Sequence, residues 1–364
     1  MEYRKIPHGD DTFSTIGIGA GSLELASAEE VENIIRYAME RGVNFMDTIM
    51  NRDTAAEPIA HALKGVRSQM KIQIHFGAYY PNGVYQRTRN PKEVQKGFEQ
   101  ELKKYGTDYA DIGMIHCVDE LDDFDEVMNG GTFEYASKLK QDGTIHYLGF
   151  ASHNPDICKK FIETGAFDVF MLSLNASYDF EPADGMLSLS QKRVELYQEC
   201  QKRGIGITVM KPYGGGQLLN AGTSPFGRAM TIPQCFQYAL DRPAVLSCLP
   251  GVRSVQDLKE ALSYYESTKE ERDYSFLVNL PNKGMQGACI YCNHCQPCPA
   301  GIDIGLVSKY MDLAKSGDEL AGEHYLKLNR HASDCIGCGS CERNCPFHVE
   351  VRSRIAQAKE FFGI

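Results

Sequence analysis

Cysteines are concentrated near the end of the 364-residue sequence, where eight of the thirteen lie between Cys289 and Cys345. They form two blocks, Cys289-x₂-Cys292-x₂-Cys295-x₂-Cys298-Pro299 and Cys335-x₂-Cys338-x₂-Cys341-x₃-Cys345-Pro346. Three cysteines at three-residue steps suit one iron–sulfur cluster, and a fourth followed by proline suits ligation of a second cluster. Zinc, the alternative, would use two paired Cys-x₂-Cys units rather than four closely stepped cysteines. The spacing therefore favours two [4Fe–4S] clusters.

This arrangement resembles the bacterial two-cluster ferredoxins, in which each block gives its last cysteine to the other cluster. The resemblance implies two ligand sets, Cys289, Cys292, Cys295 and Cys345 for one cluster, and Cys335, Cys338, Cys341 and Cys298 for the other. Two departures stand out: the first block has two residues rather than three before its last cysteine, and 36 residues separate the blocks. That interval has room for helices through Leu306–Ala314 and Leu320–Leu328.

A second group of candidate catalytic or binding residues lies at the C-terminal ends of the predicted strands. Its members are Asp47, Thr48, His75, His116, Ser152, His153, Asn175 and Lys211. A lone histidine is more often a packed core residue, but several polar groups at one end of a sheet indicate an active site. The five cysteines outside the two blocks are Cys117, Cys158, Cys200, Cys235 and Cys248. We expect these to be buried, unreactive thiols, with Cys117 set apart because it follows His116.

The sequence indicates a scaffold that brings such strand ends together. Eight short apolar runs alternate with amphipathic segments, at Ile16–Ala20, Asn44–Thr48, Lys71–Phe76, Ala110–His116, Tyr147–Ser152, Val169–Asn175, Gly206–Pro212 and Ser247–Gly251. Their composition suits strands that are buried on both faces of a parallel sheet. Eight such units in roughly 250 residues predict an α/β fold, the (β/α)₈ TIM barrel, whose chemistry sits at the C-terminal ends of the strands.

Helix-start signals stand between the predicted strands. Ser27 with Glu30 predicts a capping box. Further N-cap signals are Asn90-Pro91, Asn154-Pro155 and Ser254 with Asp257. The opening segment Tyr3–Thr15 predicts a hairpin that closes the barrel floor. The acidic run Asp119–Glu126 is interpreted as a solvated loop.

The strand and cysteine patterns predict the domain boundaries, and the net charge limits the classes of partner. The barrel pattern predicts a first domain at 1–272, and a small, mainly helical ferredoxin-type domain follows at 285–364. A net charge of −10 argues against nucleic-acid or anionic-membrane partners. The N-terminus has no apolar signal and no stretch of about 18 apolar residues occurs, so we expect a cytoplasmic protein. We expect a small-molecule substrate and leave the oligomeric state open.

Several motifs, taken in order, resemble landmarks of the aldo-keto reductases, and more closely the subgroup with a C-terminal two-cluster iron–sulfur domain. They are Gly42-Val-Asn-Phe-Met-Asp47-Thr48, Asp108-Tyr-Ala-Asp-Ile-Gly-Met-Ile-His116, Leu148-Gly-Phe-Ala-Ser152, Val209-Met-Lys-Pro-Tyr-Gly-Gly-Gly216 and Leu249-Pro-Gly-Val-Arg-Ser254. The family uses an Asp, Tyr, Lys, His tetrad, in which tyrosine donates the proton. Asp47 and His116 match its first and last members. The tyrosine position holds Arg52, or Asp53 if one residue is inserted, and the lysine position holds His75.

The family's nicotinamide site is also only partly retained. Its arginine and Glu-Asn pair correspond to Asp257, Glu260 and Ala261, so only the glutamate is kept. Arg253 and Lys259 are candidate substitutes, because a phosphate needs positive charge more than one fixed side chain. Other candidate cofactor residues are Ser152 and Asn175, which equally suit a substrate headgroup. Lys211 would position an anionic group or form a salt bridge across the barrel, and Gly214 and Gly215 would let backbone amides approach a phosphate. NADP(H) therefore stays open as a second cofactor.

The substitutions suggest a different acid. An aspartate beside a histidine favours the imidazolium, so Asp47 with His75 predicts a general acid, and His116 orients the substrate oxygen or shares the proton. Tyr79 or Tyr80 is a candidate replacement phenol, with loop packing as the alternative. Arg52 suits a carboxylate or phosphate on the substrate, unless it pairs with Asp53 or Glu57 at the surface.

Three functions follow from these residues. The first is an iron–sulfur oxidoreductase whose clusters pass electrons to or from an anionic or carbonyl-containing substrate, with an external electron carrier as a candidate partner. The second is an NADPH-dependent carbonyl reductase with a rearranged proton donor. The third is a lyase, an isomerase or an electron-carrying scaffold on the same barrel.

Overall fold

The computed structural model describes residues 1–183, 186–277, 287, 289, 291, 295–315, 317–345 and 348–364. The chain forms two compact units. The first comprises Met1–Leu174, Lys192–Pro212 and Phe236–Arg272, and the second comprises Asn175–Gln191, Tyr213–Cys235 and Asp273–Ile364. Two segments before residue 272 thus belong to the same unit as the C-terminal residues. Compactness does not by itself define a folding domain, so the division into 1–272 and 285–364 stays a prediction.

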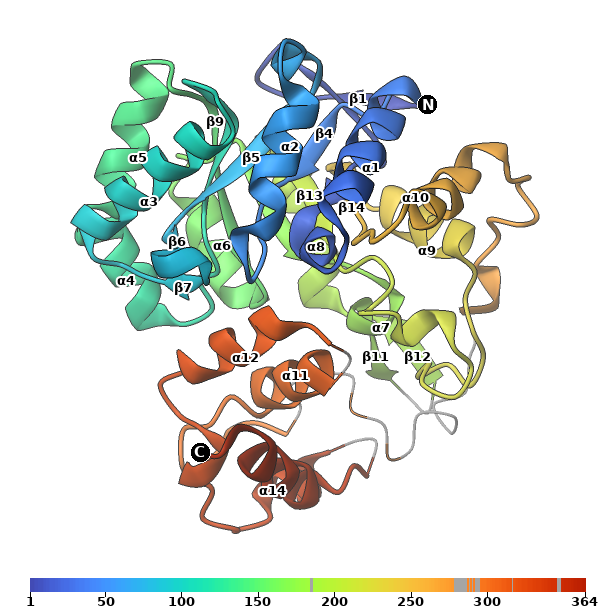
Figure 1. The fold of residues 1–364 in the computed structure, drawn as a ribbon. Coiled ribbons are helices and arrows are strands. Elements are labelled where there is room, and N and C mark those ends of the chain that lie inside the picture. The colour runs from blue at the N-terminus through green and yellow to red at the C-terminus, as the bar shows by residue number, and fades with distance from the viewer. Residues whose placement is uncertain are drawn as a thin grey trace. The chain divides into compact units, whose positions relative to one another are not determined.

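The first unit contains eight parallel strands in the order β14-β13-β10-β9-β8-β5-β4-β3 (Figure 1). Their bounds are β3 Ile18–Gly19, β4 Phe45–Asp47, β5 Lys71–Phe76, β8 Ala110–Ile115, β9 Ile145–Ser152, β10 Val169–Ser173, β13 Gly206–Met210 and β14 Val245–Leu249. Parallel bridges join Ile16 to Cys248 and Gly19 to Gly251, which closes the sheet into a barrel. Each predicted run overlaps one of these strands, and the α/β TIM-barrel fold is confirmed.

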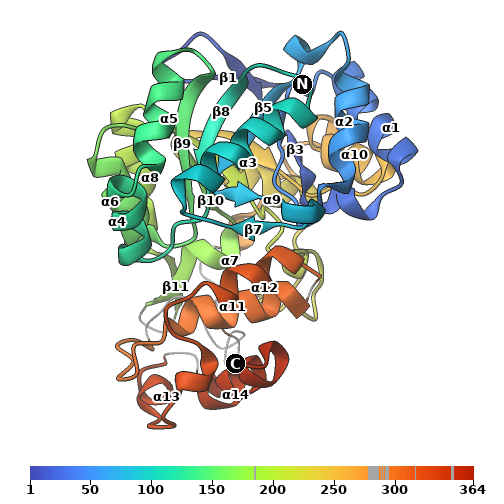
Figure 2. The same cartoon turned by 60° about the vertical axis from the view of Figure 1, so that its left-hand side comes forward.

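A helix follows each strand of this sheet. The helices are α1 Ala28–Glu40, α2 Ala56–Leu63, α3 Pro91–Lys104, α5 Thr132–Gln141, α6 Pro155–Glu163, α8 Gln191–Arg203, α9 Ile232–Leu240 and α10 Val255–Leu262. Figures 1 and 2 show α1, α2, α3 and α5 on the outside of the sheet. The predicted N-caps are confirmed: the side chains of Ser27, Asn90, Asn154 and Ser254 accept hydrogen bonds from the first-turn amides.

The predicted floor hairpin is present as β1 (Tyr3–Lys5) paired antiparallel with β2 (Thr12–Ser14). Arg4 Nη1 donates to the carbonyl of Val245, the first residue of β14, at 2.6 Å. Ile6 and Phe13 are fully buried and pack into the barrel core. The hairpin therefore covers the N-terminal end of the strands, opposite the end that carries the polar residues.

The acidic run interpreted as a solvated loop is largely helical, and that interpretation was wrong. Leu121–Asn129 form α4, because Phe124 and Val127 give the run an apolar side. Val127 is fully buried, and the Phe124 ring packs against Phe161 with centroids 4.7 Å apart. Asp119, at the start of the run, is only 4% exposed and belongs to the site described below.

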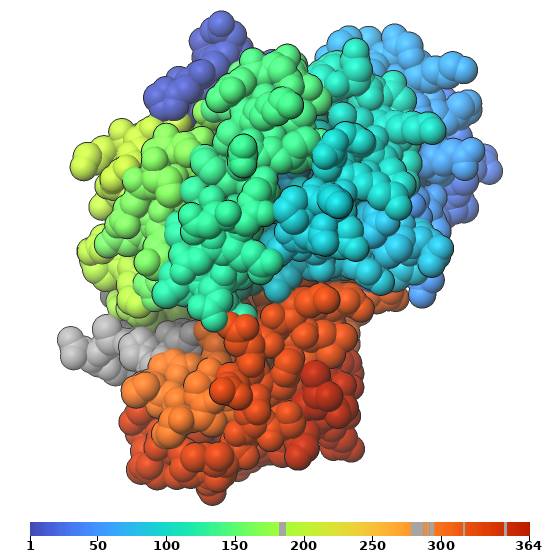
Figure 3. Space-filling view, turned by 90° about the vertical axis from the view of Figure 1, so that its left-hand side faces the viewer, coloured from blue at the N-terminus to red at the C-terminus, as the bar shows by residue number. Residues whose placement is uncertain are grey.

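The second unit is small and mainly helical in its C-terminal part, as predicted. Its longer helices are α11 Ile304–Lys315, α12 Glu319–Leu326 and α14 Val351–Phe362, and its shorter elements are α7 Ala176–Asp179, β11 Phe180–Ala183, β12 Met186–Leu189 and α13 Ser340–Asn344. Helices α11 and α12 confirm the two predicted between the cysteine blocks. The Tyr325 and Phe362 rings stack 3.8 Å apart and tie α12 to α14. The C-terminal residues form one continuous block in orange and red (Figure 3).

No helix among the described residues has both the length and the apolar character needed to cross a membrane.

Candidate active site at the strand ends

Three side chains from neighbouring strands form a hydrogen-bonded series at the C-terminal end of the barrel. Asp47 ends β4, His75 lies near the end of β5, and His116 directly follows β8. His75 Nε2 lies 2.6 Å from Asp47 Oδ1, and His75 Nδ1 lies 2.8 Å from His116 Nδ1. All three are buried, with at most 4% of any residue exposed. The structure thus brings three of the predicted catalytic residues together.

Gln73, a residue that no sequence motif singles out, completes this group. Side chains two residues apart on a strand share a face, so Gln73 points to the same side of β5 as His75. Gln73 Nε2 donates to Asp47 Oδ1 at 2.8 Å and lies 3.3 Å from Met171 Sδ, which β10 places across the barrel interior. The Asp47 carboxylate therefore has two donors that fix its orientation. The alternation of side chains along β5 is the signal that identifies Gln73.

Two placements of the hydrogen atoms are compatible with these contacts. Both take Asp47 Oδ1 as the acceptor of a proton on His75 Nε2, and both place one proton between the two facing Nδ1 atoms. In one state both rings are neutral and His116 Nδ1 is the donor. In the other, His75 is an imidazolium and His116 carries its proton on Nε2. The two states differ by one proton taken up at His116 Nε2, so the series has the geometry of a proton relay.

The structure does not bring the predicted catalytic residue Tyr79 to this series. The Tyr79 ring packs instead beside α3, where Lys96 Nζ lies 5.6 Å from its centroid. Tyr80 is buried and donates its hydroxyl to a backbone carbonyl at 3.0 Å, and burial raises the pKa of Tyr80 well above its ordinary value. The phenol ring that contacts the series is Tyr85, whose centroid lies 5.4 Å from that of His116.

Arg52 lies at the surface beside the barrel mouth. Its side chain is exposed, and its backbone N–H donates to the Glu24 carboxylate. The carboxylate of Asp53, which the sequence offered as a surface partner for Arg52, pairs with Lys104 instead. Anion binding by Arg52 stays a prediction.

Two arginines hold the chain that follows β8 in place. Arg87, in the short strand β7 (Gln86–Arg87), donates to the Cys117 carbonyl at 2.9 Å, and Arg89 donates to the His116 carbonyl at 2.8 Å. Both guanidiniums also pair with Asp123, on α4. Their spacing of two residues places both on one side of an extended chain, which is the signal that marks them as a pair.

Ser152 is bound to a buried carboxylate. Ser152 Oγ donates to Asp119 Oδ1 at 3.0 Å, and the His153 backbone amide donates to the same oxygen. Asp119 Oδ2 lies 3.1 Å from His153 Nδ1 and 3.4 Å from Cys117 Sγ. The predicted role of Ser152 in cofactor or substrate binding stays a prediction, because its hydroxyl is engaged within the protein.

The remaining candidates, Asn175, Lys211, Gly214 and Gly215, lie at or beyond the ends of β10 and β13. Asn175 is buried and caps α7, where its Oδ1 accepts from Ser177 Oγ at 2.6 Å. Lys211 follows β13 with a φ of 59°, a conformation that costs energy for a residue with a side chain. Gly214 and Gly215, at φ values of 61° and 68°, adopt the same conformation without that cost because they have no side chain. Binding by any of them stays a prediction.

The N-terminus of α10, where the family places cofactor-binding residues, is occupied by the protein's own acceptors. Glu30 Oε1, from α1, accepts from the Val255 amide at 2.7 Å, and Asp257 Oδ2 accepts from the Arg253 amide at 2.8 Å. Ser254 Oγ accepts from the Asp257 amide at 3.0 Å. A helix N-terminus binds phosphate through such free amides and its positive dipole. Two carboxylates here therefore do not fit a nicotinamide cofactor's phosphate, although the Arg253 side chain is exposed.

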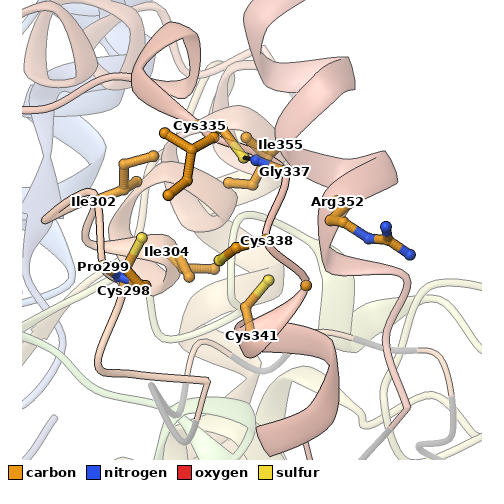
Figure 4. Close-up of a pocket in the computed structure, with 12 residues that line it drawn as sticks. Cys298, Pro299, Ile302, Ile304, Cys335, Gly337, Cys338, Cys341, Arg352 and Ile355 are labelled. Carbon is orange, nitrogen blue, oxygen red and sulfur yellow. Dashed lines mark hydrogen bonds between the residues drawn. The ribbon is translucent and has the colours of Figure 1, made fainter.

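Four cysteines of the two blocks surround one cavity in the second unit. Cys298, Cys335, Cys338 and Cys341 line it together with Ile302, Ile304 and Ile355 (Figure 4). The Gly337 amide donates to Cys335 Sγ at 3.4 Å, an N–H···S contact of the kind that tunes cluster potentials. Four thiols around an apolar-walled cavity fit a [4Fe–4S] cluster, and they are the set that the ferredoxin resemblance assigns to one cluster.

The other set is partly described. Burial raises the pKa of the Cys289 thiol, opposed by the nearby Arg354 guanidinium. Cys295 is half-buried and Cys345 is buried, and Cys292 lies outside the described residues. The five cysteines outside the blocks are all buried, as predicted. Burial raises the pKa of the Cys200 and Cys235 thiols to about 12, which agrees with unreactive side chains.

Comparison with known proteins agrees with this fold. The solved aldo-keto reductase AKR11C1 from Bacillus halodurans, in its holo form, superposes with a TM-score of 0.61 at 22% identity, covering 75% of this chain and 94% of that one. The sequence is 23% identical over 282 residues to the uncharacterized oxidoreductase YqkF of Bacillus subtilis, covering 71% of this chain and 90% of that protein. It is 24% identical to the NADH-specific methylglyoxal reductase of Escherichia coli, covering 59% of this chain and 69% of that protein.

Two family models match consecutive parts of the chain. Residues 288–350 match the 4Fe-4S dicluster domain, which supports iron–sulfur clusters as cofactors. Residues 15–231, more than half of the chain, match the aldo/keto reductase family. The chain therefore belongs to the aldo/keto reductase family and is an oxidoreductase that carries a 4Fe–4S ferredoxin-type domain.

Proposed function

We propose that this protein passes single electrons from its iron–sulfur clusters to a small carbonyl-containing substrate at the C-terminal end of the barrel. The observation that carries the proposal is the buried Asp47–His75–His116 series. This series occupies the place where the family has its proton donor for hydride transfer, a tyrosine whose pKa is lowered by a lysine. A barrel without that acid but joined to a ferredoxin-type domain suits electron transfer better than hydride transfer.

Two sets of cysteines hold the clusters in this proposal, Cys298, Cys335, Cys338 and Cys341 for one, and Cys289, Cys292, Cys295 and Cys345 for the other. When bound, the clusters supply single electrons at low potential. The lining of one cavity by the complete first set supports its assignment.

The protein's own residues supply a proton to the substrate oxygen. His116 Nε2 donates, the shared proton moves from His75 Nδ1 to His116 Nδ1, and His75 becomes neutral. Asp47 stabilises the His75 imidazolium before transfer, and Gln73 fixes the Asp47 carboxylate. Positioned proton donors of this kind typically contribute 10²–10⁴-fold in rate.

The reaction balances as a two-electron reduction. A carbonyl takes up two electrons and two protons to become an alcohol. Two bound clusters would supply one electron each, and an external low-potential carrier would restore them. The histidine series delivers the proton to oxygen, and solvent delivers the proton to carbon.

A nicotinamide-dependent carbonyl reductase is the second candidate, because the chain belongs to the aldo/keto reductase family. The carboxylates of Glu30 and Asp257 at the N-terminus of α10 count against it, since both would repel a cofactor phosphate.

The deciding experiment uses the anaerobically purified holoenzyme and a panel of aldehydes and ketones. We expect turnover with reduced methyl viologen, two viologen cations oxidised per alcohol formed, and no change when NADPH is added. Turnover with NADPH in place of the viologen would establish the second candidate. Absence of turnover with either donor across the panel would refute both.

A further inference from the structure

A second group of side chains converges beside the histidine series, and the mechanism above does not use it. Cys117 Sγ, Asp119 Oδ2 and His153 Nδ1 lie within 4.8 Å of one another, and all three residues are buried. The individual separations are 3.4 Å from sulfur to oxygen, 3.1 Å from nitrogen to oxygen and 3.9 Å from sulfur to nitrogen.

The geometry of this group differs from that of a catalytic Cys-His-Asp relay. In a relay, the cysteine and the carboxylate contact opposite nitrogens of the imidazole. Here Cys117 Sγ and Asp119 Oδ2 both approach the same atom, His153 Nδ1. Three potential ligand atoms that lie this close together form a group that could hold a metal ion.

We propose that Cys117, Asp119 and His153 bind a divalent transition-metal ion, with Zn²⁺ as the best match. Zinc takes thiolate, imidazole and carboxylate ligands at about 2.0–2.3 Å in a tetrahedron, which places ligand atoms roughly 3.3–3.6 Å apart. The observed separations bracket that range. Three protein ligands leave the fourth position for water or a substrate oxygen, as in catalytic zinc sites.

Neighbouring groups hold the ligands as they do around established metal sites. Asp119 Oδ1 accepts from Ser152 Oγ and from the His153 amide, and Oδ2 is the oxygen that lies near Cys117 Sγ and His153 Nδ1. Cys117 has a φ of 42°, a left-handed conformation that a residue with a side chain rarely adopts. Arg87 and Arg89 hold that strained peptide through the Cys117 carbonyl.

The charges around the group are consistent with a cation. With a metal ion bound, Asp119 and Cys117 as a thiolate would together provide two negative charges in a buried site, where an uncompensated charge is costly. The Arg87 and Arg89 guanidiniums beside the site are partly neutralised by Asp123. A divalent ion compensates the two ligand charges directly.

The test is metal content of the anaerobically purified holoenzyme after incubation with ZnCl₂ and desalting, with zinc, iron and sulfide measured together. We expect one zinc per chain beyond the cluster iron, and at least about 100-fold weaker zinc binding in Cys117→Ser, Asp119→Asn and His153→Gln, since even outer-shell changes cost 10–100-fold. Cys200→Ser, another buried thiol of the same unit, is the matched control and should keep the zinc.

The outcomes separate this site from zinc that has entered the cluster cysteines. Zinc that persists in all three ligand variants, or no zinc in the parent protein at saturating ZnCl₂, would overturn the proposal. Anomalous scattering at the zinc absorption edge gives a readout that does not depend on the variants. It should place a peak within about 2.5 Å of Cys117 Sγ, Asp119 Oδ2 and His153 Nδ1.

Discussion

Two groups built from histidine and carboxylate lie at the ends of neighbouring strands, and their geometries differ. In the Asp47–His75–His116 series each nitrogen of His75 has its own partner, so the contacts run in a line. In the Cys117, Asp119 and His153 group two partners approach one nitrogen, so the contacts converge. A linear series can pass a proton from one end to the other, whereas a convergent group can share one cation.

The two groups share a support, which makes the comparison testable. Arg89 donates to the carbonyls of both His116 and Cys117. The linear series should therefore be sensitive to loss of either histidine as a proton carrier, and the convergent group to loss of a ligand atom. Changes in the shared support should affect both.

The largest expected effect is on the linear series. His75→Phe removes the central proton carrier, so kcat for carbonyl reduction should fall by about 10²–10⁴-fold. Iron, sulfide and zinc content should stay at parent values, because the described hydrogen-bond partners of the His75 side chain are Asp47, Gln73 and His116. His146→Gln serves as the control, because it changes a histidine whose side chain is partly exposed. An activity within threefold of the parent in His75→Phe would show that the series does not carry the proton.

Removal of the shared support should weaken both groups together. Asp123→Ala leaves Arg87 and Arg89 without their carboxylate, and their side chains are only 14% and 7% exposed. Breaking such a buried pair should lower the free energy of unfolding by about 3–5 kcal/mol, measured by anaerobic denaturant titration.

The control for that change is Asp156→Ala. Asp156 pairs with Lys192 at the surface, where both side chains are 71% exposed, so the loss should stay below about 1 kcal/mol. Equal losses for the two variants would contradict the supporting role of Asp123.

A smaller effect is expected at the N-terminus of α10. Glu30→Ala removes the acceptor of the Val255 amide and should cost about 0.5–2 kcal/mol of stability, as loss of other helix caps does. Glu29→Ala, at an exposed neighbouring position, should change stability by less than about 0.5 kcal/mol. Calorimetry should detect no saturable NADPH binding to the parent protein, and tight binding would show that the two carboxylates do not block the cofactor.

The smallest effect is expected at Tyr79. Its ring packs beside Lys96 of α3, away from the linear series, so Tyr79→Phe should leave kcat within about twofold of the parent. A loss comparable to that of His75→Phe would restore Tyr79 as the replacement phenol. Steady-state assays with the same carbonyl substrate compare the two variants directly.

The sequence predicted features whose signals are local. Eight β-branched runs and four N-caps depend on neighbouring residues, and the barrel fold then places Asp47, His75 and His116 at one end. The 4Fe–4S domain is predictable for the same reason, since Cys335, Cys338 and Cys341 lie three residues apart in the sequence.

The residues that the sequence did not reveal depend on contacts between distant parts of the chain. Asp119 meets His153 across 34 positions, and Arg89 meets the His116 carbonyl across 27. Asp119 was hidden because it begins an acidic run, and such runs are usually solvated. Its carboxylate is bound by Ser152 and His153 at the end of β9, contacts that no short pattern encodes.

The most direct test of the account is a single-turnover measurement on His116→Phe. The clusters are reduced anaerobically, mixed with substrate without nicotinamide, and their reoxidation is followed in H₂O and in D₂O. The parent protein should reoxidise rapidly with a solvent isotope effect. His116→Phe should be slower by about 10²–10⁴-fold with its cluster spectrum unchanged. Equal reoxidation rates in the two proteins would contradict the claim that His116 delivers the proton.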